Sequence, residues 1–235
     1  MMNRFAVALF SLLAVCAQAL SAAAESTDPR QLDFDVFLDD RPIGYQRFAL
    51  VPVRDGLRIE TRAEFEVRIL GFTAFEYLHS NVEQWRDGCL DSIESSTDSN
   101  GEIYRVSGRA DDGGFRVAGK SDERRLQGCV VSFAYWDKTR LLGREQLLNP
   151  QTGEHVAVEI ASVGTRPLRL GGRELEVEQY ALRGKDIDIV LSYATGSGEW
   201  IALESRLDGG RVLRYLRSGS GRASLTADPA LSSPS

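Results

Sequence analysis

The sequence has few of the side chains that carry metal or nucleophile chemistry. Its 235 residues include two His, three Cys and two Met. Neither an HExxH nor a GxSxG motif occurs, and there is no phosphate-binding glycine loop or cysteine quartet. His79 and His155 lie far apart, without the spacing of a metal site. We therefore expect no metal and no cofactor, and the sequence identifies no catalytic residue.

A basic surface is also missing. The chain has 28 Lys and Arg against 34 Asp and Glu, which gives a net charge of −6, and both signs are scattered along it. Non-specific binding to nucleic acid rests on clustered cations. We therefore expect no nucleic-acid partner.

The chain begins like an exported protein. Arg4 precedes an apolar run over residues 5 to 20, and three alanines follow at 22 to 24. This pattern predicts a signal peptide over residues 1–24 and a periplasmic mature protein. One alternative is an uncleaved anchor, but the run is shorter than the roughly 20 residues that span a bilayer. A second alternative is lipidation at Cys16. No later apolar run has spanning length, so we expect no transmembrane span after cleavage.

Signal cleavage would leave two cysteines, Cys89 and Cys129. An even pair in an oxidising compartment favours a disulfide. The alternative is two separate buried thiols. Because no CxxC spacing suggests redox catalysis, we expect a structural bridge.

Apolar and polar residues alternate through most of the chain. Between Leu57 and Arg68 one face is largely apolar, and the other carries a charged residue at every position. Glycine-containing turn dipeptides recur at short intervals and are typical of hairpin connections. The pattern predicts a mainly β fold, an antiparallel meander.

The alternation stops after Ser132, where residues 132–142 also lack glycine. Ser132 is a suitable N-cap, so we expect one short helix over residues 132–148. No linker rich in Pro and Ser divides the chain, which favours a single β domain over residues 25–217. Two packed halves, about 31–130 and 154–217, joined by the helix are the alternative. Residues 218–235 are expected to form a disordered tail.

Several short motifs occur in an order that resembles a known family. They are EQWRDGCL at 83–90, STDSNG at 96–101, YWD at 135–137 and LLNPQTG at 147–153, together with Ile43-Gly44 and Trp200. This set resembles a bacterial exported family of uncharacterised proteins, domain of unknown function 6134, over residues 31–217. The resemblance implies an antiparallel curved sheet or half-open β-barrel. It implies no activity, so no catalytic residue is carried over.

One predicted strand places aromatic and hydrogen-bonding side chains on a single face. Such a mixture is typical of small-molecule pockets, and two aromatic residues of the predicted helix would cover the row. In this interpretation Tyr77 and Trp85 anchor a hydrophobic part of the ligand, while His79 and Glu83 orient its polar head. The alternative is a core row whose polar members are satisfied by neighbouring strands. The candidate ligand-binding residues are Phe75, Tyr77, His79, Asn81, Glu83, Trp85, Tyr135 and Trp136.

These observations favour a non-catalytic binding module for a hydrophobic or amphipathic small molecule or lipid. One alternative is a cell-envelope protein that acts in protein–protein interaction or assembly. A second alternative is a hydrolase whose site is assembled from distant residues. A lined pocket would favour the binding module, whereas a filled interior with an exposed apolar patch would favour the interaction protein.

Overall fold

The structure is a computed structural model that describes residues 28–69, 72–120 and 122–219. The predicted signal peptide, residues 1–24, lies outside the described residues. So does the predicted tail from residue 220 onward. None of the helices in the described ranges is long and apolar enough to cross a membrane.

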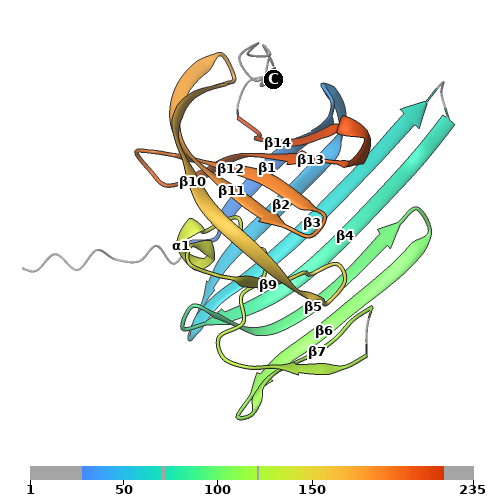
Figure 1. The fold of residues 1–235 in the computed structure, drawn as a ribbon, viewed down its shortest axis with the longest axis vertical. Helices are drawn as coiled ribbons and strands as arrows, with labels where there is room; N and C mark the ends of the chain where they lie inside the picture. The colour runs from blue at the N-terminus through green and yellow to red at the C-terminus, as the bar shows by residue number, and fades with distance from the viewer. Residues whose placement is uncertain (1–27, 70–71, 121, 220–235) are drawn as a thin grey trace, which may run out of the picture.

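The described residues form one antiparallel sheet of fourteen strands (Figure 1). Strands β1 to β8 pair in succession, as do β9 to β14, and β1 pairs with β14 to join the two series. The strands are β1 (Arg30–Leu38), β2 (Arg41–Val53), β3 (Gly56–Ile69), β4 (Phe72–Arg86), β5 (Cys89–Ser99), β6 (Glu102–Asp111), β7 (Gly114–Ala118), β8 (Arg124–Leu126), β9 (Gln146–Leu148), β10 (His155–Leu170), β11 (Arg173–Gly184), β12 (Ile187–Ala194), β13 (Trp200–Arg206) and β14 (Val212–Arg217). The mainly β, antiparallel prediction is confirmed. The edge strands β8 and β9 are not paired with each other, so the sheet is curved but not closed.

Local sequence explains the strands and their turns. On β1, Leu32, Phe34 and Val36 point inward and are fully buried, because alternate residues of a strand share one face. Asn100 and Gly101 connect β5 to β6 with positive φ angles of 56° and 89°. Two positive φ angles in succession match the twist of a tight hairpin, and Asn and Gly are the residues that tolerate them best.

The chain between β8 and β9 fills one end of the sheet's interior. Val130, Ala134 and Trp136 from this connection are buried. The Trp136 ring meets the Trp85 ring edge to face, with centroids 5.5 Å apart. We call this region the packed end; its core includes Leu32, Phe34, Trp85, Ile93, Trp136, Leu147 and Trp200.

The helix predicted over residues 132–148 is much shorter in the structure. Helix α1 spans only Lys138–Leu141, and its N-cap is Asp137, which accepts a hydrogen bond from the Thr139 amide at 3.0 Å. Ser132, Ala134 and Trp136 are all buried, and the stretch runs through tight turns, in which the Ala134 amide donates to the Ser132 carbonyl at 2.7 Å and the Asp137 amide to the Ala134 carbonyl at 3.0 Å. Pairing with β9 holds it there, since the Leu148 amide donates to the Val131 carbonyl at 2.8 Å.

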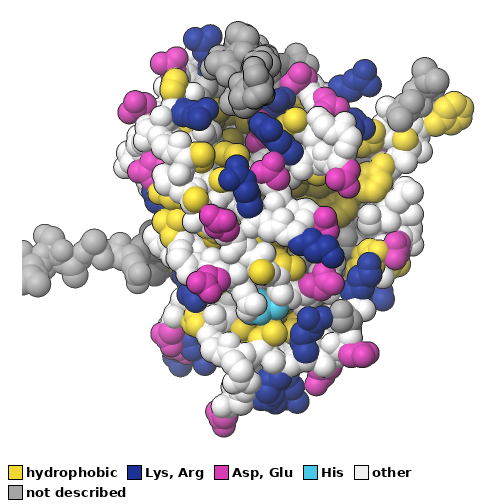
Figure 2. Space-filling model, viewed as in Figure 1, with side chains coloured by type: hydrophobic (Ala, Val, Ile, Leu, Met, Phe, Trp, Pro, Cys, Tyr) yellow, Lys and Arg dark blue, Asp and Glu magenta, His cyan; other side chains and the backbone are white. Residues whose placement is uncertain are grey.

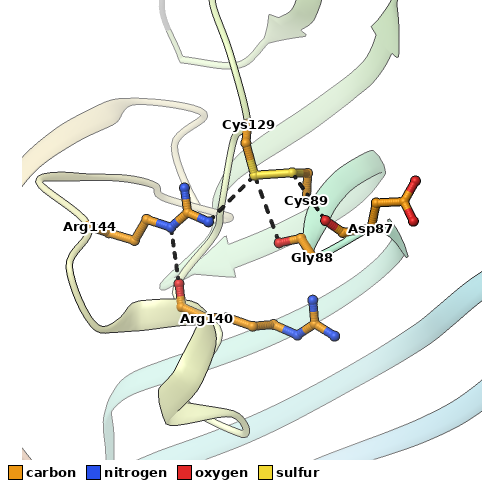
Figure 3. The surroundings of a disulfide bond; sticks show 6 residues. All are labelled: Asp87, Gly88, Cys89, Cys129, Arg140 and Arg144. Carbon is orange, nitrogen blue, oxygen red and sulfur yellow. Dashed lines mark hydrogen bonds between the residues drawn. A yellow bond between two sulfur atoms is a disulfide. The ribbon is translucent and has the colours of Figure 1, made fainter.

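A disulfide fixes the entry of this connection into the interior (Figure 3). Cys89 at the start of β5 is bonded to Cys129, with their Cα atoms 5.2 Å apart, which confirms the predicted bridge. Arg144 donates from Nη2 to Cys129 Sγ at 3.5 Å and from Nε to the Arg140 carbonyl at 3.3 Å. The bridge therefore joins the sheet to the segment that fills it.

Candidate functional site

Beside the packed end the curved sheet encloses a cavity of about 310 Å³. Strands β2 to β4 form one wall and β12 to β14 the opposite wall, while residues 133–136 and 149–151 close it. Figure 2 shows hydrophobic side chains in a hollow next to the projecting ends of β3 and β4. The lining residues are Gln46, Phe48, Thr61, Ala63, Phe65, Tyr77, His79, Asn81, Glu83, Phe133, Tyr135, Trp136, Asn149, Pro150, Gln151, Asp186, Ile187, Ile189, Leu203, Ser205, Leu213 and Tyr215.

Buried polar side chains gather on the inner face of β3, β4 and β5. The cross-strand register places Thr61, Asn81 and Ser95 side by side. One step along, His79 lies opposite Thr97. All five are buried. We call this inner face the polar wall: Thr61, His79 and Asn81 line the cavity, and Ser95 and Thr97 on β5 extend the polar cluster beside it.

Glu83 lies at the inner end of this polar wall and is 3% exposed. Its Oε1 accepts a hydrogen bond from Asn81 Nδ2 at 3.0 Å, and its Oε2 accepts one from Trp85 Nε1 at 2.8 Å. Burial raises the pKa of the Glu83 carboxyl, against hydrogen bonds from Asn81, Ser132 and Trp85 that lower it. The carboxyl group is thus occupied in tying β4 to the segment inside the sheet.

His79 and Tyr77 form the middle of the same row. The Nδ1 atom of His79 lies 2.8 Å from the Thr97 hydroxyl oxygen. Burial lowers the pKa of His79 to about 4, so its ring is neutral at pH 7. Tyr77 stacks on Phe65 with ring centroids 5.0 Å apart, and burial raises the pKa of its phenol. Both rings therefore present uncharged surfaces to the cavity.

The opposite wall is mainly apolar. Its apolar members are Ile187 and Ile189 on β12, Leu203 on β13 and Leu213 on β14, and Ser205 on β13 adds one hydroxyl group. Tyr215, also on β14, adds an aromatic ring, and burial raises the pKa of its phenol hydroxyl. A molecule in the cavity would therefore meet hydrogen-bonding groups on one side and aliphatic side chains on the other.

Six of the eight candidate residues line the cavity: Tyr77, His79, Asn81, Glu83, Tyr135 and Trp136. The other two do not. Trp85 lies on the side of the packed end, where Trp136 covers it and its Nε1 donates a hydrogen bond to Glu83. Phe75 is 37% exposed toward the outer end of β4. A ligand-binding role for the row stays a prediction.

Two features were not found from the sequence: the polar residues that β5 places beside the polar wall, and the apolar wall of the cavity. Ser95 and Thr97 occupy inward positions of β5, where alternation would place apolar residues. The available signal was that β5 carries serine or threonine on both of its faces, which indicates polar groups on the inward face. No comparable signal distinguishes Ile187, Leu203 or Leu213 from ordinary core residues, because their shared cavity depends on how the sheet curls.

Within residues 28–69, 72–120 and 122–219, no group of three or more His, Cys, Asp and Glu is placed to hold a metal ion.

Comparisons with known proteins agree with the fold. The model of a domain of unknown function, DUF6134, matches residues 34–218, and the chain belongs to this family. Among solved structures, the chain is similar to a beta-barrel-like protein of domain of unknown function DUF1849 from Brucella abortus, with a TM-score of 0.57 and 13% sequence identity. The alignment covers 80% of this chain and 94% of that one, which shows a shared fold. No curated protein matches.

Proposed function

We propose that this protein is a non-catalytic binding protein that holds a small amphipathic molecule inside its curved sheet. The observation that carries the proposal is the cavity of about 310 Å³ between a polar wall and an apolar wall. Small-molecule sites are concave, largely preformed and lined by apolar groups with a few placed polar ones. The volume matches the lower end of such sites, which begin at about 300 Å³.

Different residues of the lining contact different parts of the ligand. The aliphatic side chains of β12 to β14 bury its apolar part, which supplies most of the affinity. His79 and Asn81 meet its polar part and fix its orientation. Glu83 acts indirectly, because its carboxyl group holds the Asn81 amide. Trp85 supports the same arrangement from behind the wall.

We also propose that the protein works in the periplasm. The pattern of residues 1–24 supports export. The Cys89–Cys129 disulfide supports it independently, since disulfides persist in oxidising compartments and are rare in the cytosol. N-terminal sequencing of the native protein should begin after Ala24; a chain that still begins with Met1 would contradict cleavage.

Filling the cavity tests the binding function. Ala63 is buried on β3 and lines the cavity, so Ala63→Leu adds three carbon atoms to the cavity space. Ala110→Leu makes the same change at an exposed position of β6 and serves as the matched control. In calorimetric titrations with octan-1-ol, we expect Ala63→Leu to weaken binding at least tenfold and Ala110→Leu to leave it unchanged. Equal binding by both variants would place the ligand elsewhere.

One observation favours the interaction protein as a second candidate function. Phe72 is 78% exposed at the start of β4, and Phe75 is also exposed. Exposed aromatic side chains at a projecting hairpin are suited to contact another protein. If protein–protein interaction were the function, Phe72→Ser should abolish binding to the partner protein, and Ala63→Leu should leave that binding unchanged.

A further inference from the structure

We propose that the cavity selects an uncharged amphiphile, whose head group carries a hydroxyl or an amide instead of a carboxylate, a phosphate or an ammonium. This inference rests on the proposed binding function and names the chemical class of its ligand. Three features of the lining support it: the absence of a cation, the occupied state of the buried acid, and an unpaired amide oxygen in the polar wall.

An anionic head group would have no partner. Among the described residues that line the cavity there is no Lys and no Arg. The acidic members of the lining are Glu83 and Asp186, and the histidine, His79, is neutral at pH 7. A carboxylate or phosphate entering the cavity would lose its hydration without gaining a counter-charge, which strongly opposes binding.

A cationic head group is disfavoured for a different reason. Both oxygens of Glu83 already accept hydrogen bonds, from Asn81 and Trp85, and burial raises the pKa of its carboxyl group, which weakens Glu83 as a counter-charge. Asp186 is exposed in the turn between β11 and β12, so its attraction for a cation is weakened by water. The tyrosines facing the cavity, Tyr77, Tyr135 and Tyr215, keep their protons because burial raises the pKa of each phenol.

A neutral donor fits the polar wall. Asn81 lines the cavity, and its Oδ1 is buried with no hydrogen-bond partner in the described part of the chain. The hydroxyl oxygen of Ser95, directly opposite Asn81 in the register, is also without a partner there. Buried polar atoms in proteins are nearly always hydrogen-bonded. Because Asn81 Oδ1 has almost no accessible surface, the amide would turn toward the cavity so that a hydroxyl or amide N–H of the ligand could donate to it and complete the wall.

The experiment compares three eight-carbon probes that differ only in the head group: octan-1-ol, octanoate and octylammonium. Chains of this length suit a cavity that holds about ten non-hydrogen atoms at roughly 30 Å³ each. In calorimetric titrations at pH 7, we expect octan-1-ol to bind at least tenfold more tightly than either ion. If an ion binds as well or better, the uncharged-ligand inference is wrong while the binding function stands. If none of the three binds, the binding function itself is contradicted.

A charge placed in the wall sharpens the test. Gln46 lines the cavity from β2 and is half-buried, so Gln46→Lys brings an ammonium to the lining with little change in length. We expect Gln46→Lys to strengthen octanoate binding at least tenfold and weaken that of octylammonium. Gln31→Lys, on the exposed side of β1, is the control and should change neither. Ser205→Lys on the opposite wall repeats the test if Gln46→Lys does not fold. No gain for octanoate in a folded variant would contradict the inference.

Discussion

The two ends of the sheet's interior are built from the same strands and differ in what covers them. At the packed end, Trp136 from the connection before β9 lies against Trp85, and Phe34 packs on Trp200 with ring centroids 4.1 Å apart. At the other end, which we call the cavity end, Ala63, Phe65, Tyr77 and Tyr215 surround open space. The packed end is therefore filled by side chains, and the cavity end is the part to which we assign binding in the proposed function.

Strand β4 shows this change within a single row. Its inner face runs from Trp85 through Glu83, Asn81 and His79 to Tyr77. The first member is closed off by Trp136, and the next four line the cavity. If the proposed function is right, adjacent residues of one strand face serve stability and recognition separately, and substitutions along the row should separate the two properties.

Loss of the disulfide should have the largest effect on the packed end. The bridge closes a loop with a sequence separation of 40. In the chain-entropy model, removing a disulfide that closes a loop of this length lowers the free energy of unfolding by about 4 kcal/mol. Replacing both Cys89 and Cys129 by Ala should lower the denaturant midpoint accordingly. A loss of less than about 1 kcal/mol would mean that the entering segment is held without the bridge.

A matched pair of leucines compares the two ends directly. Leu147 is fully buried in the packed end, whereas Leu213 is half-buried on the cavity wall. We expect Leu147→Ala to cost about 3 kcal/mol, because it opens a new void in a filled region. Leu213→Ala should cost about 1 kcal/mol, since it enlarges a space that already exists. Equal losses in urea unfolding would show that the cavity end is as tightly packed as the other.

Titration of His79 should produce a smaller, pH-dependent effect at the cavity end. Its pKa is lowered by burial to about 4 in the folded protein, from an ordinary value of 6.5. The unfolded chain therefore takes up the proton first, and the stability due to neutral His79 is lost as the pH falls from about 6.5 toward 4. Between pH 7 and pH 4.5 this amounts to roughly 2 kcal/mol.

His79→Gln isolates this contribution. The raised pKa of Glu83 acts with the opposite sign, since the stability due to a raised carboxyl pKa is lost as the pH rises. Subtracting the variant's pH dependence from that of the wild type removes the contributions the two proteins share. If urea unfolding gives parallel pH curves, His79 is not buried in a neutral form.

The exposed aromatic at the hairpin should have the smallest effect on folding. Phe72 is 78% exposed, so Phe72→Ser should change the unfolding free energy by less than about 0.5 kcal/mol. A loss above about 1 kcal/mol would indicate that Phe72 is covered in solution, which would favour the interaction function.

The sequence predicted the antiparallel architecture and the disulfide because both depend on local or pairwise signals. Alternation identified the strands, and the two cysteines remaining after residue 24 had one possible pairing. The extent of the helix was wrong, since Val131 and Ser132 pair with β9 and the chain from Ser132 to Asp137 then follows tight turns. The row on β4 was found from its period, whereas Leu203 and Leu213 join the site only through the curvature of the sheet.

The most direct test of the account is native mass spectrometry of the protein purified from its own cellular compartment, compared with Ala63→Leu prepared in the same way. The account predicts a small uncharged amphiphile bound to the wild-type protein at one per chain and a loss of that mass in the variant. A wild-type protein that carries no ligand and binds none of the three eight-carbon probes would contradict it.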